Sequence, residues 1–128
     1  MEIEILEKIK KPKIELDPET QFDVERQVMV RSWYPFSTRV RIWPNTYLRC
    51  NNTNKKAKLL YTDNVGKYPH WTQVKPNERF LMVFEALPDE CLRFDLIEDI
   101  PEPGGFYIRM IPRDKIDVYD VPMIEGAI

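Results

Sequence analysis

The chain has few of the residues on which catalytic and metal sites usually depend. Among its 128 residues there is one histidine, His70, and there are two cysteines, Cys50 and Cys91. No Cys-x-x-Cys or His-x-x-His pair is present to organise a zinc site. The four glycines lack the spacing of phosphate-binding loops. The sequence therefore predicts a protein that is not an enzyme and that holds no metal or cofactor.

Long apolar runs are also missing. The longest, residues 80–84, falls far short of the roughly 20 residues that cross a bilayer. The N-terminus, Met-Glu-Ile-Glu-Ile-Leu-Glu-Lys, lacks the basic and then apolar pattern of a secretory signal. We therefore expect no membrane partner and a cytoplasmic location. In a reducing cytosol the two cysteines would be buried thiols, whereas in an exported protein they would be able to form one disulfide.

Proline, in contrast, is abundant, with eleven residues spread along the chain. Between the prolines lie short runs rich in β-branched and aromatic residues, which is typical of many short strands joined by turns. The candidate strands are residues 2–7, 25–33, 39–43, 47–50, 56–62, 79–85, 92–98, 106–111 and 116–121. We expect one all-β domain across residues 1–128, with residues 1–20 as an edge strand and mobile connection and residues 64–78 as a loop between sheets.

Three polar or proline-rich segments predict turns. Residues 51–54, Asn-Asn-Thr-Asn, favour a hairpin between the strands on either side. Residues 87–90, Leu-Pro-Asp-Glu, favour a turn. Residues 101–105, Pro-Glu-Pro-Gly-Gly, predict a turn with positive φ at Gly104 or Gly105.

Several short motifs between residues 38 and 100 resemble a known kind of domain. They are Trp43-Pro44-Asn45-Thr46 before Leu48, Lys58-Leu59-Leu60, Pro69-His70-Trp71-Thr72, Phe80 to Phe84, Leu87-Pro88 and Phe94-Asp95-Leu96-Ile97-Glu98. Together they are similar to the small immunoglobulin-like β-sandwich domains of uncharacterised bacterial proteins. The resemblance implies an immunoglobulin-like β-sandwich of about eight strands, and it brings no catalytic or binding residues. Such domains are usually exported.

Charge is distributed unevenly along the chain. From Arg26 to Tyr61 every ionised side chain is positive, with aromatic residues interleaved, whereas Glu85 to Glu102 is acidic. A basic and aromatic stretch favours a polyanion or single-stranded nucleic acid as ligand. Alternatively, the basic strands lie beside the acidic ones and stabilise the sheet by cross-strand pairing.

We expect a protein-interaction or self-association module, with nucleic-acid binding as the second hypothesis and a carbohydrate site on Tyr68 and Trp71 as a further form of binding. The candidate ligand-binding residues are Trp33, Tyr34, Arg39, Arg41, Trp43, Tyr68, His70 and Trp71. Their aromatic members are too many to bury in so small a domain, so an exposed aromatic patch is expected.

Two chemical alternatives follow from the remaining polar residues. A pair formed by His70 and one cysteine is the minimum for nucleophilic catalysis. Four carboxylates of the acidic segment, those of Asp95, Glu98, Asp99 and Glu102, are candidates for a cation site.

Overall fold

A computed structural model describes residues 26–123, and its regular elements are all β-strands. Ten strands lie in this range. They are β1 (Val28–Trp33), β2 (Thr38–Ile42), β3 (Tyr47–Cys50), β4 (Lys56–Asp63), β5 (Gly66–Lys67), β6 (Thr72–Val74), β7 (Phe80–Phe84), β8 (Arg93–Ile97), β9 (Tyr107–Pro112) and β10 (Val118–Pro122). The all-β prediction is confirmed. The predicted strand at residues 2–7 and the connection within residues 1–20 lie outside the described residues.

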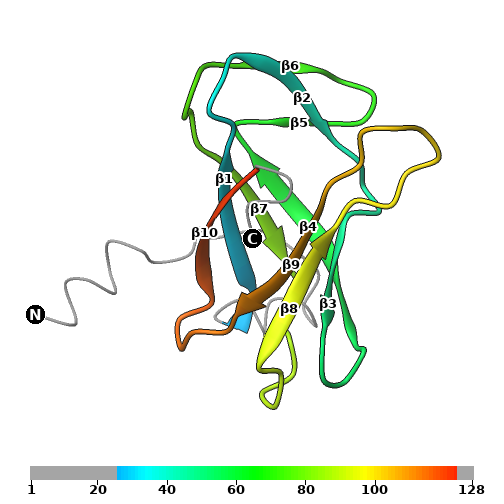
Figure 1. The fold of residues 1–128 in the computed structure, drawn as a ribbon, viewed down its shortest axis with the longest axis vertical. Coiled ribbons are helices and arrows are strands. Elements are labelled where there is room, and N and C mark those ends of the chain that lie inside the picture. The colour runs from blue at the N-terminus through cyan, green and yellow to red at the C-terminus, as the bar shows by residue number, and fades with distance from the viewer. Residues whose placement is uncertain (1–25, 124–128) are drawn as a thin grey trace, which may run out of the picture.

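Two sheets share these strands (Figure 1). Seven strands form the large sheet in the order β10-β1-β7-β4-β3-β8-β9, and three form the small sheet in the order β5-β2-β6. All neighbours in the large sheet are antiparallel except β1 and β10, which run parallel. In the small sheet β2 is antiparallel to β6 and parallel to β5.

The large sheet curls around one main hydrophobic core, and a second, small cluster of Met29, Val83 and Val118 lies apart from it. The ring of Phe94 on β8 meets the ring of Tyr119 on β10 edge-on, with centroids 4.9 Å apart, although five places separate these strands in the sheet order. Alternate residues of each strand point inward, as the pleat of a strand requires, so Val28 and Val30 share the core with Phe94 and Leu96. A bulge in β4 after Leu59 adds to the bend.

The small sheet closes one end of this curl (Figure 1). Val40, Ile42 and Val74 point from it into the same core. The expectation that residues 64–78 form only a loop is wrong, because β5 and β6 lie within this segment and flank β2. These strands have two and three residues, too few for a period of two to reveal them.

The predicted turns have the expected chemistry. β3 and β4 form the antiparallel hairpin, with Asn54 at φ 62°. The turn before β8 is closed by a hydrogen bond from the Cys91 N–H to the Pro88 carbonyl. Gly104 has φ 105°, as predicted. At Gly105 a Cβ atom would clash with the carbonyl oxygen of Glu98, so this second glycine permits a close approach of the backbone.

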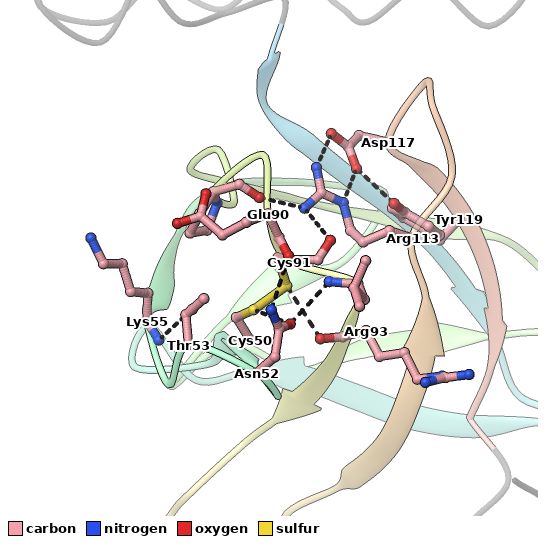
Figure 2. The surroundings of a disulfide bond; sticks show 12 residues. Cys50, Asn52, Thr53, Lys55, Glu90, Cys91, Arg93, Arg113, Asp117 and Tyr119 are labelled. Carbon is pink, nitrogen blue, oxygen red and sulfur yellow. Dashed lines mark hydrogen bonds and ion pairs between the residues drawn. A yellow bond between two sulfur atoms is a disulfide. The ribbon is translucent and has the colours of Figure 1, made fainter.

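A disulfide, drawn in Figure 2, links two segments at the end of the large sheet that lies opposite the small sheet in Figure 1. Cys50 at the end of β3 is bonded to Cys91 before β8, with Cα atoms 5.8 Å apart, and both residues are buried. The side chain of Asn52 spans the same junction, donating to the Glu90 carbonyl and accepting from the Leu92 N–H. The prediction of two buried thiols for a cytoplasmic protein is therefore wrong, and the cysteines form the disulfide that was the alternative for an exported one.

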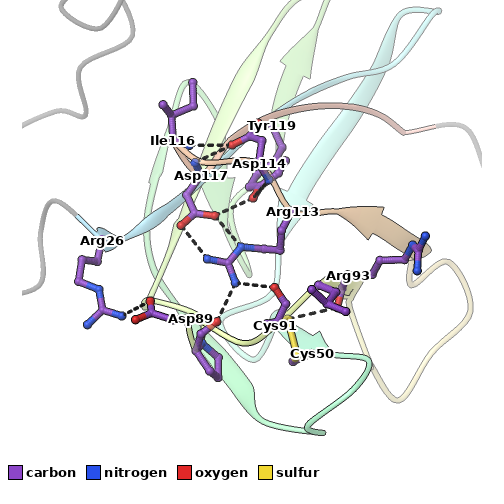
Figure 3. Close-up of polar contacts among 12 residues, drawn as sticks. Arg26, Cys50, Asp89, Cys91, Arg93, Arg113, Asp114, Ile116, Asp117 and Tyr119 are labelled. Carbon is purple, nitrogen blue, oxygen red and sulfur yellow. Dashed lines mark hydrogen bonds and ion pairs between the residues drawn. A yellow bond between two sulfur atoms is a disulfide. The ribbon is translucent and has the colours of Figure 1, made fainter.

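An arginine holds the neighbouring loops together (Figure 3). Arg113, between β9 and β10, makes a two-pronged ion pair with Asp117 and donates to the carbonyls of Pro88 and Cys91. Asp117 also accepts a hydrogen bond from the Tyr119 hydroxyl at 2.6 Å. Burial raises the pKa of Tyr119, and this bond to Asp117 raises it further. The group joins the β7–β8 and β9–β10 loops beside the disulfide.

No helix within residues 26–123 has both the length and the apolar character needed to cross a membrane.

Candidate functional site

The alternation of β2 sets two arginines and a tryptophan in one row. Arg39 and Arg41 point to the face opposite Val40 and Ile42, which are buried, and Trp43 continues the row just beyond the strand. Because successive side chains of a strand point to opposite faces, burying the two aliphatic residues places the cationic ones outward. The predicted alternation from Arg39 to Trp43 is therefore confirmed.

The turn between β5 and β6 brings two further aromatic residues to this row. β5 runs parallel to β2, and the Tyr68 N–H donates to the Ile42 carbonyl, so Tyr68 lies beside Trp43. Their rings stack with centroids 3.9 Å apart and an interplanar angle of 27°. The Gly66 N–H donates to the Thr72 hydroxyl, which closes the turn that carries Trp71.

Arg41 is the centre of the group. Its guanidinium carbon lies 4.1 Å from the ring centroid of Trp71, 4.6 Å from that of Tyr68 and 5.8 Å from that of Trp43. Arginine is attracted to ring faces at such distances. On its other side the guanidinium forms a 3.5 Å ion pair with Glu102, from the β8–β9 loop that rises beside the small sheet in Figure 1.

Arg39 completes the cluster. Its guanidinium carbon lies 5.3 Å from the centroid of Trp71, and its side chain is exposed. Trp71 keeps 50% of its surface exposed and Tyr68 keeps 41%. We name Arg39, Arg41, Trp43, Tyr68 and Trp71 the aromatic–arginine site.

A buried carboxylate, that of Glu98, is hydrogen-bonded to the backbone of the site. Glu98 is 7% exposed, and its carboxylate accepts a hydrogen bond from the backbone N–H of Trp43 at 3.1 Å. Burial raises the pKa of the Glu98 carboxyl above its usual value, against the opposing effects of backbone N–H groups and the Arg41 charge. The side chain of Asn45 also donates to the Asp99 carbonyl. These bonds fix the segment carrying Trp43 to the end of β8.

The raised pKa of Glu98 predicts a pH dependence of stability. Between the unfolded-state pKa, near 4.5, and the higher folded-state pKa, the folded protein binds a proton that the unfolded chain releases, so acidification through this window stabilises the fold. We expect the thermal midpoint of the unaltered protein to rise relative to that of Glu98→Gln as the pH falls from 8 to 4.5. Asp99→Asn, at an exposed neighbour, is the control: it keeps Glu98 and is expected to show the same rise relative to Glu98→Gln. A constant difference between Glu98→Gln and the unaltered protein would contradict the role of Glu98.

Trp33 and Tyr34 serve other parts of the fold. The guanidinium carbon of Arg79 lies 3.6 Å from the ring centroid of Trp33. The ring of Tyr34 packs against the core and pairs with those of Phe36 and Phe80. Burial, together with the nearby charge of Glu98, raises the pKa of Tyr34 to about 12.

His70 lies exposed in the β5–β6 turn beside the site, and its backbone N–H donates to the Lys67 carbonyl. The pairing of His70 with a cysteine nucleophile is wrong, because Cys50 and Cys91 are bonded to each other.

The acidic segment does not gather its carboxylates into one cation site. Asp95 pairs with Arg49, Glu98 accepts from the Trp43 N–H, and Glu102 pairs with Arg41. Within residues 26–123 no three His, Cys, Asp or Glu side chains converge as metal ligands.

The pairing interpretation of the basic stretch is confirmed in part. Arg26, Arg41 and Arg49 form ion pairs with carboxylates of the segment from Glu85 to Glu102, as cross-strand or loop partners. Lys56 and Lys58 form no such pair among the residues the structure describes. The polyanion hypothesis for this stretch predicts that Arg39, Arg41, Arg49 and Lys56 share one uncovered face. That prediction is wrong, because the first two lie on the small sheet and the other two on the large sheet.

Comparison with known proteins gave no relatives. No family model, no curated protein and no solved structure matches the chain. The function is therefore argued from the site itself.

Proposed function

We propose that the chain is a non-enzymatic protein-interaction module that binds its partner through the aromatic–arginine site. The observation that carries this proposal is the exposure of Trp71 and Tyr68 around the guanidinium of Arg41. Tryptophan, tyrosine and arginine are the residue types most enriched among interface hot spots. An exposed cluster of all three is uncommon on a surface that contacts only water.

The site is already ordered before a partner arrives. Tyr68 is fixed by its backbone bond to Ile42 and by its stack on Trp43, and Arg41 is held between three rings and Glu102. Binding at a preorganised site loses little side-chain entropy. This rigidity supports recognition of one defined surface.

The charges around the site indicate the chemistry of the partner. Arg39 is exposed beside Trp71 and pairs with no carboxylate among residues 26–123. A partner carboxylate next to an apolar or aromatic group fits this arrangement, since the carboxylate would meet Arg39 while the apolar group covers Trp71. The partner is therefore a protein surface with acidic and apolar residues side by side.

We infer further that the module is an immunoglobulin-like sandwich working in an oxidising compartment. The two sheets, which share one main core, support the first point. The disulfide supports the second, because disulfides persist in exported proteins and are rare in the cytosol. This proposal replaces the cytoplasmic location expected from the sequence.

Site-specific photocrosslinking tests the interaction. With p-benzoylphenylalanine in place of Trp71 in the full chain, irradiation of the native cells is expected to give one discrete adduct, whose partner mass spectrometry identifies. The same photoreactive residue in place of Leu92, which is 67% exposed on the far end of the domain, is the control. An additional Arg39→Ala change is expected to reduce the adduct at position 71 several-fold. Equal adducts from both positions, or none at position 71, would contradict the proposal.

A further inference from the structure

The outer face of β4, β3, β8 and β9 carries a second group of cationic and aromatic side chains. These strands are neighbours in the large sheet, and the residues that point away from the core include five cations and two tyrosines. We name this group the basic face; it consists of Tyr47, Arg49, Lys56, Lys58, Arg93, Tyr107 and Arg109. Three of these residues, Arg93, Tyr107 and Arg109, lie outside the basic stretch noted in the sequence.

The strand register arranges the basic face in two parallel rows, with Arg93 beyond the second row, two residues before Asp95 on β8. In the first row Lys58 lies opposite Tyr47, Tyr47 opposite Ile97, and Ile97 opposite Tyr107. The two tyrosines are thus two strands apart, about 9–10 Å. Their faces are flanked by cations, with the Lys56 ammonium 4.8 Å from the centroid of Tyr47 and the Arg109 guanidinium carbon 4.7 Å from that of Tyr107.

The second row is cationic. Lys56 lies opposite Arg49, and Arg49 lies opposite Asp95. Arg109 continues the row at the bulge where β9 passes Asp95. Because residues two apart on a strand are separated by about 7 Å, the cationic row runs about 7 Å from the tyrosine row.

Asp95 is the carboxylate inside this face, and its charge is already balanced. It is 5% exposed, forms an ion pair with Arg49 at 3.3 Å and accepts from the Met110 N–H at 2.9 Å. Burial would raise the pKa of Asp95, but the hydrogen bonds from Asn51, Met110 and Arg49 lower it below the usual value. The Tyr107 hydroxyl bonds to Arg49 and Asp95, so the Tyr107 ring is held across the sheet.

Four cations of the face remain without a carboxylate partner among the described residues: Lys56, Lys58, Arg93 and Arg109. Glu85 lies at the border and uses one carboxylate oxygen to accept from the Lys58 N–H. The face therefore has a clear excess of positive charge.

The described part of the chain is basic although the whole chain is slightly acidic. Residues 26–123 contain fifteen lysines and arginines and twelve aspartates and glutamates, so the acidic excess comes from the sequence outside this range. The whole-chain net charge of −2 thus includes acidic residues that do not belong to the basic face.

From the two rows we propose a second binding site, distinct from the aromatic–arginine site: the basic face binds single-stranded nucleic acid. Bases stack on Tyr47 and Tyr107 while phosphates lie along the neighbouring cations. Single strands are bound elsewhere by this combination of ring platforms and a cationic track. An acidic polypeptide would use the cations but has no planar bases for the two flat tyrosines, so the rings favour nucleic acid.

Fluorescence anisotropy with a labelled twenty-nucleotide oligothymidine and the full chain tests the proposal. With up to four phosphate contacts, the slope of log affinity against log salt is expected to be about −2 to −3. The triple variant Lys56→Gln/Arg93→Gln/Arg109→Gln is expected to bind at least about tenfold more weakly and to reduce this slope by about 2. The matched control Lys67→Gln/Lys75→Gln/Lys115→Gln removes the same charge from other elements and is expected to keep the affinity within about twofold.

Ring removal distinguishes nucleic acid from other polyanions. Tyr107→Ala is expected to weaken oligothymidine binding by at least about fivefold with an unchanged salt slope, since a base–aromatic stack is lost and the phosphate contacts stay. Tyr107→Phe keeps the ring and the affinity, and Tyr47→Ala gives an independent loss if Tyr107→Ala fails to fold. No binding at 50 mM salt, equal effects of the two triple variants, or polyglutamate binding as tight as oligothymidine would overturn the proposal.

Discussion

Replacing Cys50 and Cys91 together by alanine is expected to lower the free energy of unfolding by about 4 kcal/mol. The bond closes a loop with a sequence separation of 41 residues, and in the chain-entropy description such a crosslink removes that much freedom from the unfolded chain. The bond also fixes the end of β3 to the segment before β8, where Asn52 depends on the same geometry. Urea denaturation followed by tryptophan fluorescence measures the change.

Reduction provides the control for the disulfide. The unaltered protein in dithiothreitol is expected to lose stability to the level of the alanine variant, whereas the variant itself is expected not to respond to dithiothreitol. A change below about 1 kcal/mol on replacement would mean that the crosslink contributes little to the fold.

Replacing Arg113 by methionine is expected to destabilise the protein by about 2–4 kcal/mol. The side chains of Arg113 and Asp117 are only 15% and 13% exposed, so the change leaves a nearly buried carboxylate without its cation. The carbonyls of Pro88 and Cys91 also lose a donor. Methionine keeps most of the aliphatic volume, so the loss reports mainly the polar contacts, and thermal or urea denaturation measures it.

A second ion pair offers the matched comparison. Arg31 and Asp120 pair at 2.9 Å across β1 and β10, with side chains 40% and 54% exposed. Arg31→Met is expected to change stability by less than about 1 kcal/mol, because exposed pairs gain little from their Coulomb attraction. If Arg31→Met and Arg113→Met lowered the free energy of unfolding equally, the buried contacts of Arg113 would not stabilise the fold more than an exposed ion pair does.

Most of the fold is predictable from local sequence pattern. The strands of the large sheet carry alternating or continuous apolar residues and end at turn residues. Eight of the ten strands overlap segments predicted from that pattern, with bounds that differ by one or a few residues. β5 and β6 were missed because strands so short are defined by their partner, β2, rather than by their own residues. The curl and the strand order depend on long-range packing, such as Phe94 on Tyr119, which no local pattern encodes.

The residue types of the candidate site were predictable from the sequence, but their arrangement in space was not. Arg39, Arg41 and Trp43 follow from one alternating strand, but their contact with Tyr68 and Trp71 depends on the parallel pairing of β5 with β2. The hydrogen bond to Glu98 likewise joins two distant segments, the end of β8 and the segment after β2. Trp33 looked equivalent to Trp71 in the sequence, yet the fold places it under Arg79.

The basic face shows the same limit more clearly. In the sequence Arg39 and Arg49 belong to one basic stretch. The sheet register instead places Arg49 with Arg109 and Tyr107. Only pairing of β3 with β8, and of β8 with β9, brings these segments together. Charge counted over the whole chain also concealed the basic character of residues 26–123.

The aromatic–arginine site and the basic face are expected to bind their ligands independently of each other. The most direct measurement compares the photoadduct at position 71 in two backgrounds, Arg39→Ala and Lys56→Gln/Arg93→Gln/Arg109→Gln. We predict that the Arg39→Ala change reduces the adduct several-fold and leaves oligothymidine affinity unchanged, while the triple change leaves the adduct unchanged. An adduct at position 71 that is insensitive to Arg39→Ala would contradict partner binding through the aromatic–arginine site.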